Sequence, residues 1–126
     1  MPALELDDGT ILVQTTSILE YLGSIYNLKG SSPLATYKGH NVAEYWIGDV
    51  FNKSVVPGVS AQGEGKEEKM AAVKAAVLAY LLKLEQVLPA DSKFLIGDSV
   101  TIYDFVVAGF FTNWCHNPKN ANYALW

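Results

Sequence analysis

The polar segment 14–17, Gln-Thr-Thr-Ser, carries the residue types best suited to chemistry in this chain. It stands directly before an apolar segment whose spacing predicts a helix. A helix start presents unpaired amide N–H groups and a positive dipole end, which attract a carboxylate. The Thr15 hydroxyl can donate to such an anion, and the Gln14 amide can donate and accept beside it. The same hydroxyls would also serve as plain helix caps, and the residues alone leave both interpretations open.

Two other residue pairs invite a chemical interpretation. Cys115 and His116 combine a nucleophile with a base, but sequence neighbours on a helix do not face each other, so a partly buried cysteine beside a surface histidine is favoured. Thr101 and Asp104 have the spacing of a capping box, in which the acid accepts the amide of the capping residue. We interpret Thr101 and Asp104 as a structural pair without a chemical role.

Composition excludes several classes of protein. The chain has 126 residues, half of them hydrophobic, and a net charge of −4. All the basic residues are lysines, which disfavours nucleic-acid binding because that function depends on arginine and a basic surface. One cysteine cannot form an intrachain disulfide, and neither a secretory signal nor a membrane-spanning segment is recognisable. We therefore expect a cytoplasmic protein without membrane insertion.

The polar segment is expected to lie between a hairpin and a helix. Asp-Gly at 8–9, between apolar runs, predicts two short strands within residues 2–13. The hydroxyl residues at 15–17 are expected to cap a helix of about three turns that ends near Asn27. Glycine, serine and proline make residues 27–33 a linker.

Three further helices are predicted after the linker. The first is amphipathic, from about Leu34 to Val56, and is expected to end at Pro57-Gly58. The second runs from Lys66 to Leu88 with one apolar stripe. The third, Ile102 to about Trp114, is apolar on nearly every face, so we expect it to be buried on all sides at the centre of a bundle.

Three motifs, in this order along the chain, resemble cytosolic glutathione S-transferases. Residues 1–9, Met-Pro-Ala-Leu-Glu-Leu-Asp-Asp-Gly, are similar to the family's strand pair, which starts at a cis-proline. Residues 14–22, Gln-Thr-Thr-Ser-Ile-Leu-Glu-Tyr-Leu, resemble the segment that holds the glutamyl end of glutathione. Residues 94–105, Phe-Leu-Ile-Gly-Asp-Ser-Val-Thr-Ile-Tyr-Asp-Phe, resemble the loop and capping box that open the central helix. The sigma and mu classes look nearest.

The resemblance implies an α/β thioredoxin-like remnant followed by an all-α bundle. Residues 1–27 would form the second, β-β-α half of the N-terminal thioredoxin-like domain. Residues 28–34 would be the linker, and residues 35–126 a partial C-terminal helical domain. Relative to the family, the chain would thus be truncated at both ends.

The resemblance also implies a glutathione site. Gln14 and Thr15 would hold the glutamyl carboxylate, and a cis bond at Pro2 would turn the backbone of Met1 toward the cysteinyl unit. Asp49 would reach the amino group of glutathione bound in a neighbouring subunit. Glutathione would be substrate or ligand, with no metal and no separate cofactor.

The family reaction is attack of the glutathione thiolate on an electrophile. The residue that activates the thiol lies, in the family, before the cis-proline strand, so no catalytic residue is carried over and the isolated chain is expected to be inactive. The alternative is a noncatalytic structural or assembly subunit with this fold. An unpaired sheet edge would need cover, so a homodimer or another protein chain is the expected partner.

Overall fold

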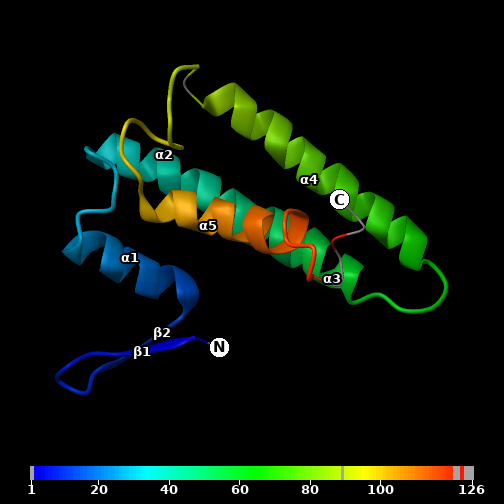
Figure 1. Cartoon of the computed structure of the whole chain (residues 1–126), viewed down its shortest axis with the longest axis horizontal. Coiled ribbons are helices and arrows are strands. Elements are labelled where there is room, and N and C mark those ends of the chain that lie inside the picture. Colours follow the sequence, from blue (N-terminus) through cyan, green and yellow to red (C-terminus); the bar gives the residue numbers. More distant parts are fainter. Residues whose placement is uncertain (1, 89, 121–122, 124–126) are drawn as a thin grey trace.

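The structure, a computed structural model, describes residues 2–88, 90–120 and 123. Among these residues the chain forms a two-stranded sheet followed by helices (Figure 1). No helix within these ranges has the length and apolarity needed to cross a membrane. The elements in chain order are β1 (Ala3–Glu5), β2 (Ile11–Val13), α1 (Thr15–Ile25), α2 (Pro33–Glu44), the π-helix η1 (Tyr45–Val55), α3 (Val56–Val59), α4 (Lys66–Val87), α5 (Ile102–Phe110) and the π-helix η2 (Phe111–Cys115).

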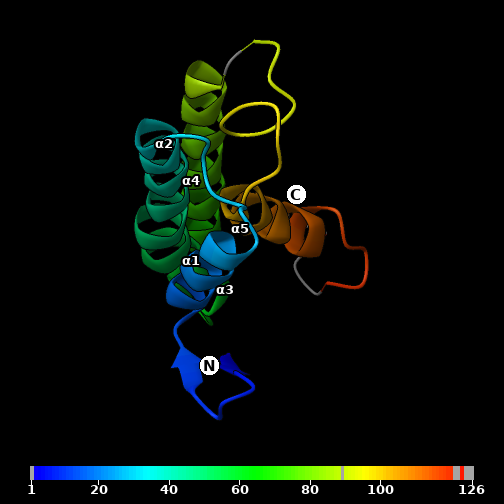
Figure 2. The same ribbon diagram turned by 90° about the vertical axis from the view of Figure 1, so that its left-hand side faces the viewer.

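The predicted hairpin is confirmed. β1 and β2 pair antiparallel, with Ala3 opposite Val13. Gly9 in the turn has a φ of 82°, a value that glycine adopts without strain. The Asp8 carboxylate accepts the Thr10 N–H at 2.9 Å, which closes the turn. Figures 1 and 2 both show the hairpin projecting beyond the helices and joined to them through α1.

Helix α1 begins as predicted but is not capped as predicted. Its N-cap is Gln14, with φ 73° and ψ 117°, and within the described part of the chain no side chain caps this helix start. Because β2 ends at Val13, the chain turns from strand into helix at Gln14 itself. Thr15 and Ser17 already lie inside the first turn, so their hydroxyls cannot occupy the cap position. The expectation of hydroxyl caps was wrong.

The next helical segment is longer than predicted. α2, η1 and α3 follow one another without a break, so helical backbone extends from Pro33 to Val59 and does not end at Pro57-Gly58. Pro57 lies in the first turn of α3. Because proline has no N–H, it leaves one backbone hydrogen bond of this continuous helical run unmade. Gly58 packs directly on α4, because a Cβ added there would lie 2.1 Å from Val73 Cγ2. The glycine permits close helix packing instead of ending the helix.

The side chains of η1 lie in two environments. Trp46, Val50 and Val55 are buried in the core. Tyr45 and Asp49 lie on another side, where they line a cleft described below.

Two hydrophobic clusters hold the helices together. The predicted apolar stripe of α4 is confirmed at its four buried residues, which face the larger cluster, but Leu81, also expected in the stripe, is 39% exposed. The smaller cluster joins α2 and α5, with Leu19 of α1 packed against it, and its buried members are Ala43, Ile102 and Tyr103. The buried members of the larger cluster, from η1, α4 and α5, are Trp46, Val50, Val55, Met70, Val73, Val77, Tyr80, Val107 and Phe110.

Helix α5 is not buried on all sides in the described chain, contrary to expectation. Tyr103 and Val107 are buried, but Phe105 is 55% exposed and Ala108 is exposed as well. α1 and α2 pack against α5 and cover one part of its surface. Helix α5 therefore carries more apolar side chains than its described neighbours cover.

Candidate functional site

The start of α1 is open to a ligand. Gln14 and Thr15 are both exposed, and the Gln14 carbonyl accepts the first helical hydrogen bond, from Ile18 N–H at 2.9 Å. The N–H groups of the first turn have no partner inside a helix. In the described part of the chain no side chain caps them. This helix end can therefore donate several N–H groups to one anion.

The backbone at Gln14 is strained. A φ of 73° with ψ 117° lies outside the basins that a residue with a side chain ordinarily occupies. Such a conformation costs on the order of 1–3 kcal/mol and persists where the surroundings fix it, most often at ligand-binding sites. Here the end of β2 and the first turn of α1 fix it on either side.

The hairpin brings Pro2 to the same place. Ala3 pairs with Val13, so the antiparallel register continued by one residue places Pro2 opposite Gln14. Pro2 is exposed. Met1, with the predicted cis bond to Pro2, lies outside the described residues. Of the predicted site residues, Pro2, Gln14 and Thr15 therefore gather at one end of the hairpin.

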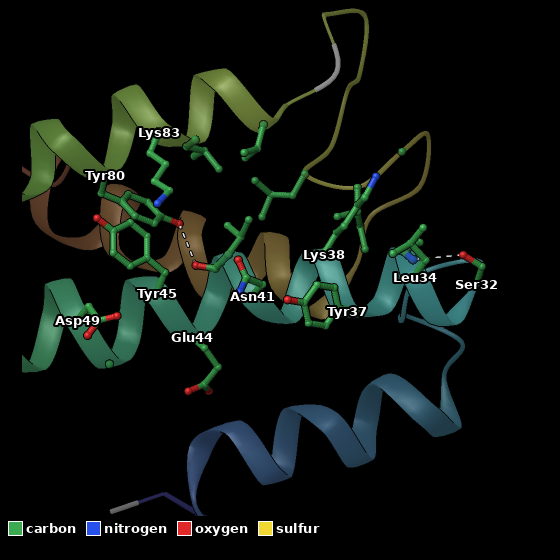
Figure 3. Close-up of a pocket in the computed structure, with 18 residues that line it drawn as sticks. Ser32, Leu34, Tyr37, Lys38, Asn41, Glu44, Tyr45, Asp49, Tyr80 and Lys83 are labelled. Atoms are coloured by element: carbon green, nitrogen blue, oxygen red, sulfur yellow. Dashed lines mark hydrogen bonds between the residues drawn. The ribbon is translucent and has the colours of Figure 1, made fainter.

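Asp49 lies elsewhere, at a cleft of about 950 Å³ (Figure 3). The cleft is formed by α2, η1, α4 and residues 95–97. Asp49 is exposed and pairs with Lys53 one turn further along η1. Residues of the α1 start do not line this cleft. Within one chain, the structure does not bring Asp49 together with Gln14 and Thr15.

The cleft combines aromatic rings with lysines, a feature that the sequence patterns did not reveal. Lys83 extends from α4 toward Tyr45, with its Nζ 5.2 Å from the ring centroid (Figure 3). The Tyr80 hydroxyl donates to the Val42 carbonyl at 3.4 Å. Burial, and the neighbouring Tyr45, raise the pKa of Tyr80, so its phenol keeps its proton. The cleft therefore combines apolar contact with the Lys83 cation, and the carboxylates of Glu44 and Asp49 also line it.

Thr101 and Asp104 form a network at the start of α5. One Asp104 carboxylate oxygen accepts the Thr101 N–H and the Thr101 hydroxyl, both at 2.7 Å. The other accepts the Leu95 N–H at 2.8 Å, which ties the preceding loop to the helix. These bonds leave Asp104 engaged with its own chain, which matches a structural role.

Cys115 lacks the surroundings of a nucleophile. It ends η2, is partly buried and packs against the larger core cluster, whereas His116 is exposed. Burial raises the pKa of the thiol, which lowers the fraction of reactive thiolate. Among the described residues, no three histidine, cysteine, aspartate or glutamate side chains gather as a metal site.

A polar cluster on Glu20 was missed by the sequence patterns. Its carboxylate bonds Lys29 Nζ at 2.7 Å, His40 Nδ1 at 3.2 Å and the Tyr103 hydroxyl at 3.1 Å. We call these four residues the Glu20 cluster. The one signal of this cluster in the sequence is Glu20 itself, a single charged residue within the apolar run at 18–22.

The Glu20 cluster makes part of the stability depend on pH. Burial raises the pKa of Glu20, but the bonds from Lys29, His40 and Tyr103 outweigh burial and hold the pKa below its usual 4.5. A folded pKa below the unfolded one gives stability that is present above about pH 4.5 and is lost as pH falls through the folded pKa. We expect the gap in urea midpoint between wild type and Glu20→Gln to shrink on acidification. A gap that widens as the pH falls would contradict this assignment.

Comparisons with known proteins agree on one family. The family model of the glutathione S-transferase C-terminal domain matches residues 47–121. A glutathione S-transferase from Ascaris lumbricoides is 27% identical with a TM-score of 0.76, over 90% of this chain and 57% of that one. One from Caenorhabditis elegans is 23% identical with a TM-score of 0.75, over 99% and 65%. One from Pseudomonas fluorescens is 19% identical with a TM-score of 0.70, over 89% and 57%.

These matches confirm the predicted fold class, a thioredoxin-like β-β-α part followed by a helical domain. No curated protein matches the chain significantly. The chain spans 57% of the Ascaris and Pseudomonas proteins.

Proposed function

Because the chain belongs to the family of glutathione S-transferase C-terminal domains, we propose that it binds glutathione at the start of α1. Gln14 and Thr15 hold the glutamyl carboxylate through the amide, the hydroxyl and the free N–H groups of the first turn. The backbone of Met1, turned by Pro2, pairs with the cysteinyl unit. Asp49 reaches the amino group of glutathione in the partner subunit of a homodimer.

The strained backbone of Gln14 carries this proposal. A residue with a side chain holds φ 73° and ψ 117° at an uncapped, exposed helix start. A plain N-cap has an extended backbone and a side chain that bonds the first turn. Gln14 does neither, so its conformation is better explained by a role toward a ligand than by helix capping.

The proposed reaction is that of the sigma and mu classes: the glutathione thiol loses its proton, and its sulfur forms a bond to an electrophilic carbon as the leaving group departs. A positioned hydrogen-bond donor must lower the thiol pKa. Tyr103 does not take this role, because it is 2% exposed and its hydroxyl already donates to Glu20 Oε1 at 3.1 Å. We assign no catalytic residue within the described ranges, and the 126 residues alone would not conjugate electrophiles. The proposed compartment is the cytoplasm.

The second candidate is a noncatalytic assembly subunit, favoured by the exposed ladder of β1 and β2. Ile11 and Val13 on β2 are 63% and 51% exposed, so another strand or chain would find apolar surface there. The coding sequence ahead of Met1 separates the candidates. A strand-helix-strand with an early tyrosine or serine supports the enzyme, and its absence supports the assembly subunit.

Glutathione titration tests the proposed site. We expect a dissociation constant no tighter than about the millimolar range, where the binding free energy is about 4 kcal/mol. Thr15→Ala removes one hydroxyl donor to a charged group, so binding should weaken by about fivefold, or about 1 kcal/mol. Calorimetry on wild type, on Thr15→Ala and on one control variant measures the three dissociation constants. The matched control is Thr112→Ala, an exposed threonine on η2, which should bind as wild type does. Equal affinities for all three proteins would remove Thr15 from the site.

A further inference from the structure

The Glu20 cluster joins four segments of the chain at one carboxylate. Glu20 lies on α1, Lys29 on the connection to α2, His40 on α2 and Tyr103 on α5. Oε1 of Glu20 accepts the Tyr103 hydroxyl at 3.1 Å and lies 3.2 Å from His40 Nδ1. Oε2 lies 2.7 Å from Lys29 Nζ. Both carboxylate oxygens are therefore occupied, and each partner lies outside α1.

The backbone around this cluster is packed too closely to shift freely. A Cβ on Gly39 would lie 2.2 Å from Cδ2 of Tyr103, so the ring rests directly on α2. A Cβ on Gly23 would lie 3.0 Å from Ile102 Cδ1, so α1 touches the first turn of α5. The Ile102 N–H also donates to the Leu28 carbonyl at 2.8 Å. The partners of Glu20 thus stand on a fixed frame.

Other ties between α1 and the helices are few. Among the described residues of α1, Gly23 alone is buried, while Tyr21 and Ile25 are exposed. Leu19 packs in part against the smaller hydrophobic cluster. Because Ile18, Leu19 and Leu22 are only half-buried, polar contacts add to packing in fixing the orientation of α1. Glu20 supplies those contacts, with its side chain 27% exposed.

Glu20 and the proposed ligand site share one rigid element. Glu20 follows Thr15 by five residues, which is about 7.5 Å along a helix axis. A tilt of α1 about Gly23, where it packs on α5, moves the Gln14–Thr15 turn and the attached hairpin together relative to the α2–α5 frame. In the proposed homodimer this shifts the bound glutathione relative to the Asp49 carboxylate of the partner subunit. A displacement of about 1 Å in a positioned group is enough to lower binding or rate severely.

We propose that Glu20 is a positioning residue for glutathione: by binding Lys29, His40 and Tyr103 it fixes the direction in which α1 presents Gln14 and Thr15. This inference rests on the proposed function, because it assigns Glu20 a part in the same site. Glu20 does not touch the ligand. It acts through α1, and its loss leaves the ligand-contacting groups present but misaligned.

The test compares glutathione affinity with stability in the full chain. Glu20→Gln keeps the size of the side chain and removes its charge. If α1 is then aligned in about a tenth of the molecules, the dissociation constant rises about tenfold. Glu85→Gln on the exposed face of α4 makes the same chemical change away from the cluster. Val77→Ala weakens the buried core without touching α1, and thereby separates loss of stability from loss of alignment.

Amide signals of residues 15–18 followed by NMR during glutathione addition give the affinity. We expect a rise of about tenfold for Glu20→Gln, and values within about twofold of wild type for Glu85→Gln and Val77→Ala. Tyr103→Phe, which keeps the ring on Gly39 and removes one bond, should give a smaller rise of about two- to threefold. If Glu20→Gln does not fold, the dissociation constant of Tyr103→Phe tests the positioning role instead.

The outcomes distinguish failure of the Glu20 positioning role from failure of the proposed glutathione site. If wild type and Glu20→Gln bind glutathione equally well, the positioning role is wrong. The proposed glutathione site is then still supported. A rise for Val77→Ala as large as that for Glu20→Gln also overturns it, because stability alone would then explain the loss. Wild type that shows no shift at residues 15–18 overturns the proposed function itself.

Discussion

Trp46→Ala is expected to destabilise the fold by about 3–5 kcal/mol, the range for removal of a large core aromatic. Trp46 is 3% exposed and lies at the centre of the larger cluster. Its ring centroid is 4.5 Å from Phe110 and 4.9 Å from Tyr80, so it joins η1 to both α5 and α4. Alanine would leave a cavity among three helices that cannot all close on it.

Leu82→Ala is the matched control for the core. Leu82 lies on α4 and is 52% exposed, so its truncation removes a large apolar side chain that buries little surface. Its expected cost is below about 1 kcal/mol. Urea denaturation followed by far-ultraviolet circular dichroism gives both midpoints. Similar losses for Trp46→Ala and Leu82→Ala would show that Trp46 is not at the centre of the core.

Asp104→Ala is expected to cost about 2–4 kcal/mol, because it leaves several donors without an acceptor. The carboxylate accepts Thr101 N–H, the Thr101 hydroxyl and Leu95 N–H, and Thr101 is buried. Alanine supplies no acceptor, and water has little access to Thr101. The start of α5 and the loop before it would lose their connection together.

Thr101→Ala measures the share of the hydroxyl in this network. Asp104 would still accept the backbone N–H groups of residues 101 and 95, so the expected cost is about 1 kcal/mol. Lys74→Ala, an exposed change on α4, should cost much less. Thermal or urea midpoints that do not fall in the order Lys74→Ala, Thr101→Ala, Asp104→Ala would contradict the assigned network.

Elements decided by neighbouring residues were predictable, and those decided by distant contacts were not. The turn at Gly9 and the buried stripe of α4 follow from local composition and spacing. Pro57-Gly58 carries the local signal of a helix end, yet helical backbone continues through it to Val59, and Gly58 lies directly against Val73 of α4. The exposure of Phe105 depends likewise on which helices cover α5.

The candidate site, too, was predictable from the sequence only in part. The spacing of residues 14–17 placed Gln14 and Thr15 at a helix start, and hairpin register brought Pro2 beside them. The strain at Gln14 is a property of the backbone that residue type does not reveal. The partners of Glu20 include His40 and Tyr103, which lie 20 and 83 positions away in the sequence. Only the folded chain shows that they share one carboxylate.

The hairpin of β1 and β2 packs against α1 and projects beyond the other helices (Figure 2). Its ladder can therefore break while the core around Trp46 stays intact, so the molecule opens in units of unequal free energy. Amide hydrogens of the hairpin exchange with solvent through local opening, whereas those of buried α4 residues exchange only through global unfolding. A ligand held between Pro2 and Thr15 would add its binding free energy to this weaker unit, and slowed exchange in the hairpin would report occupancy before any change in the core.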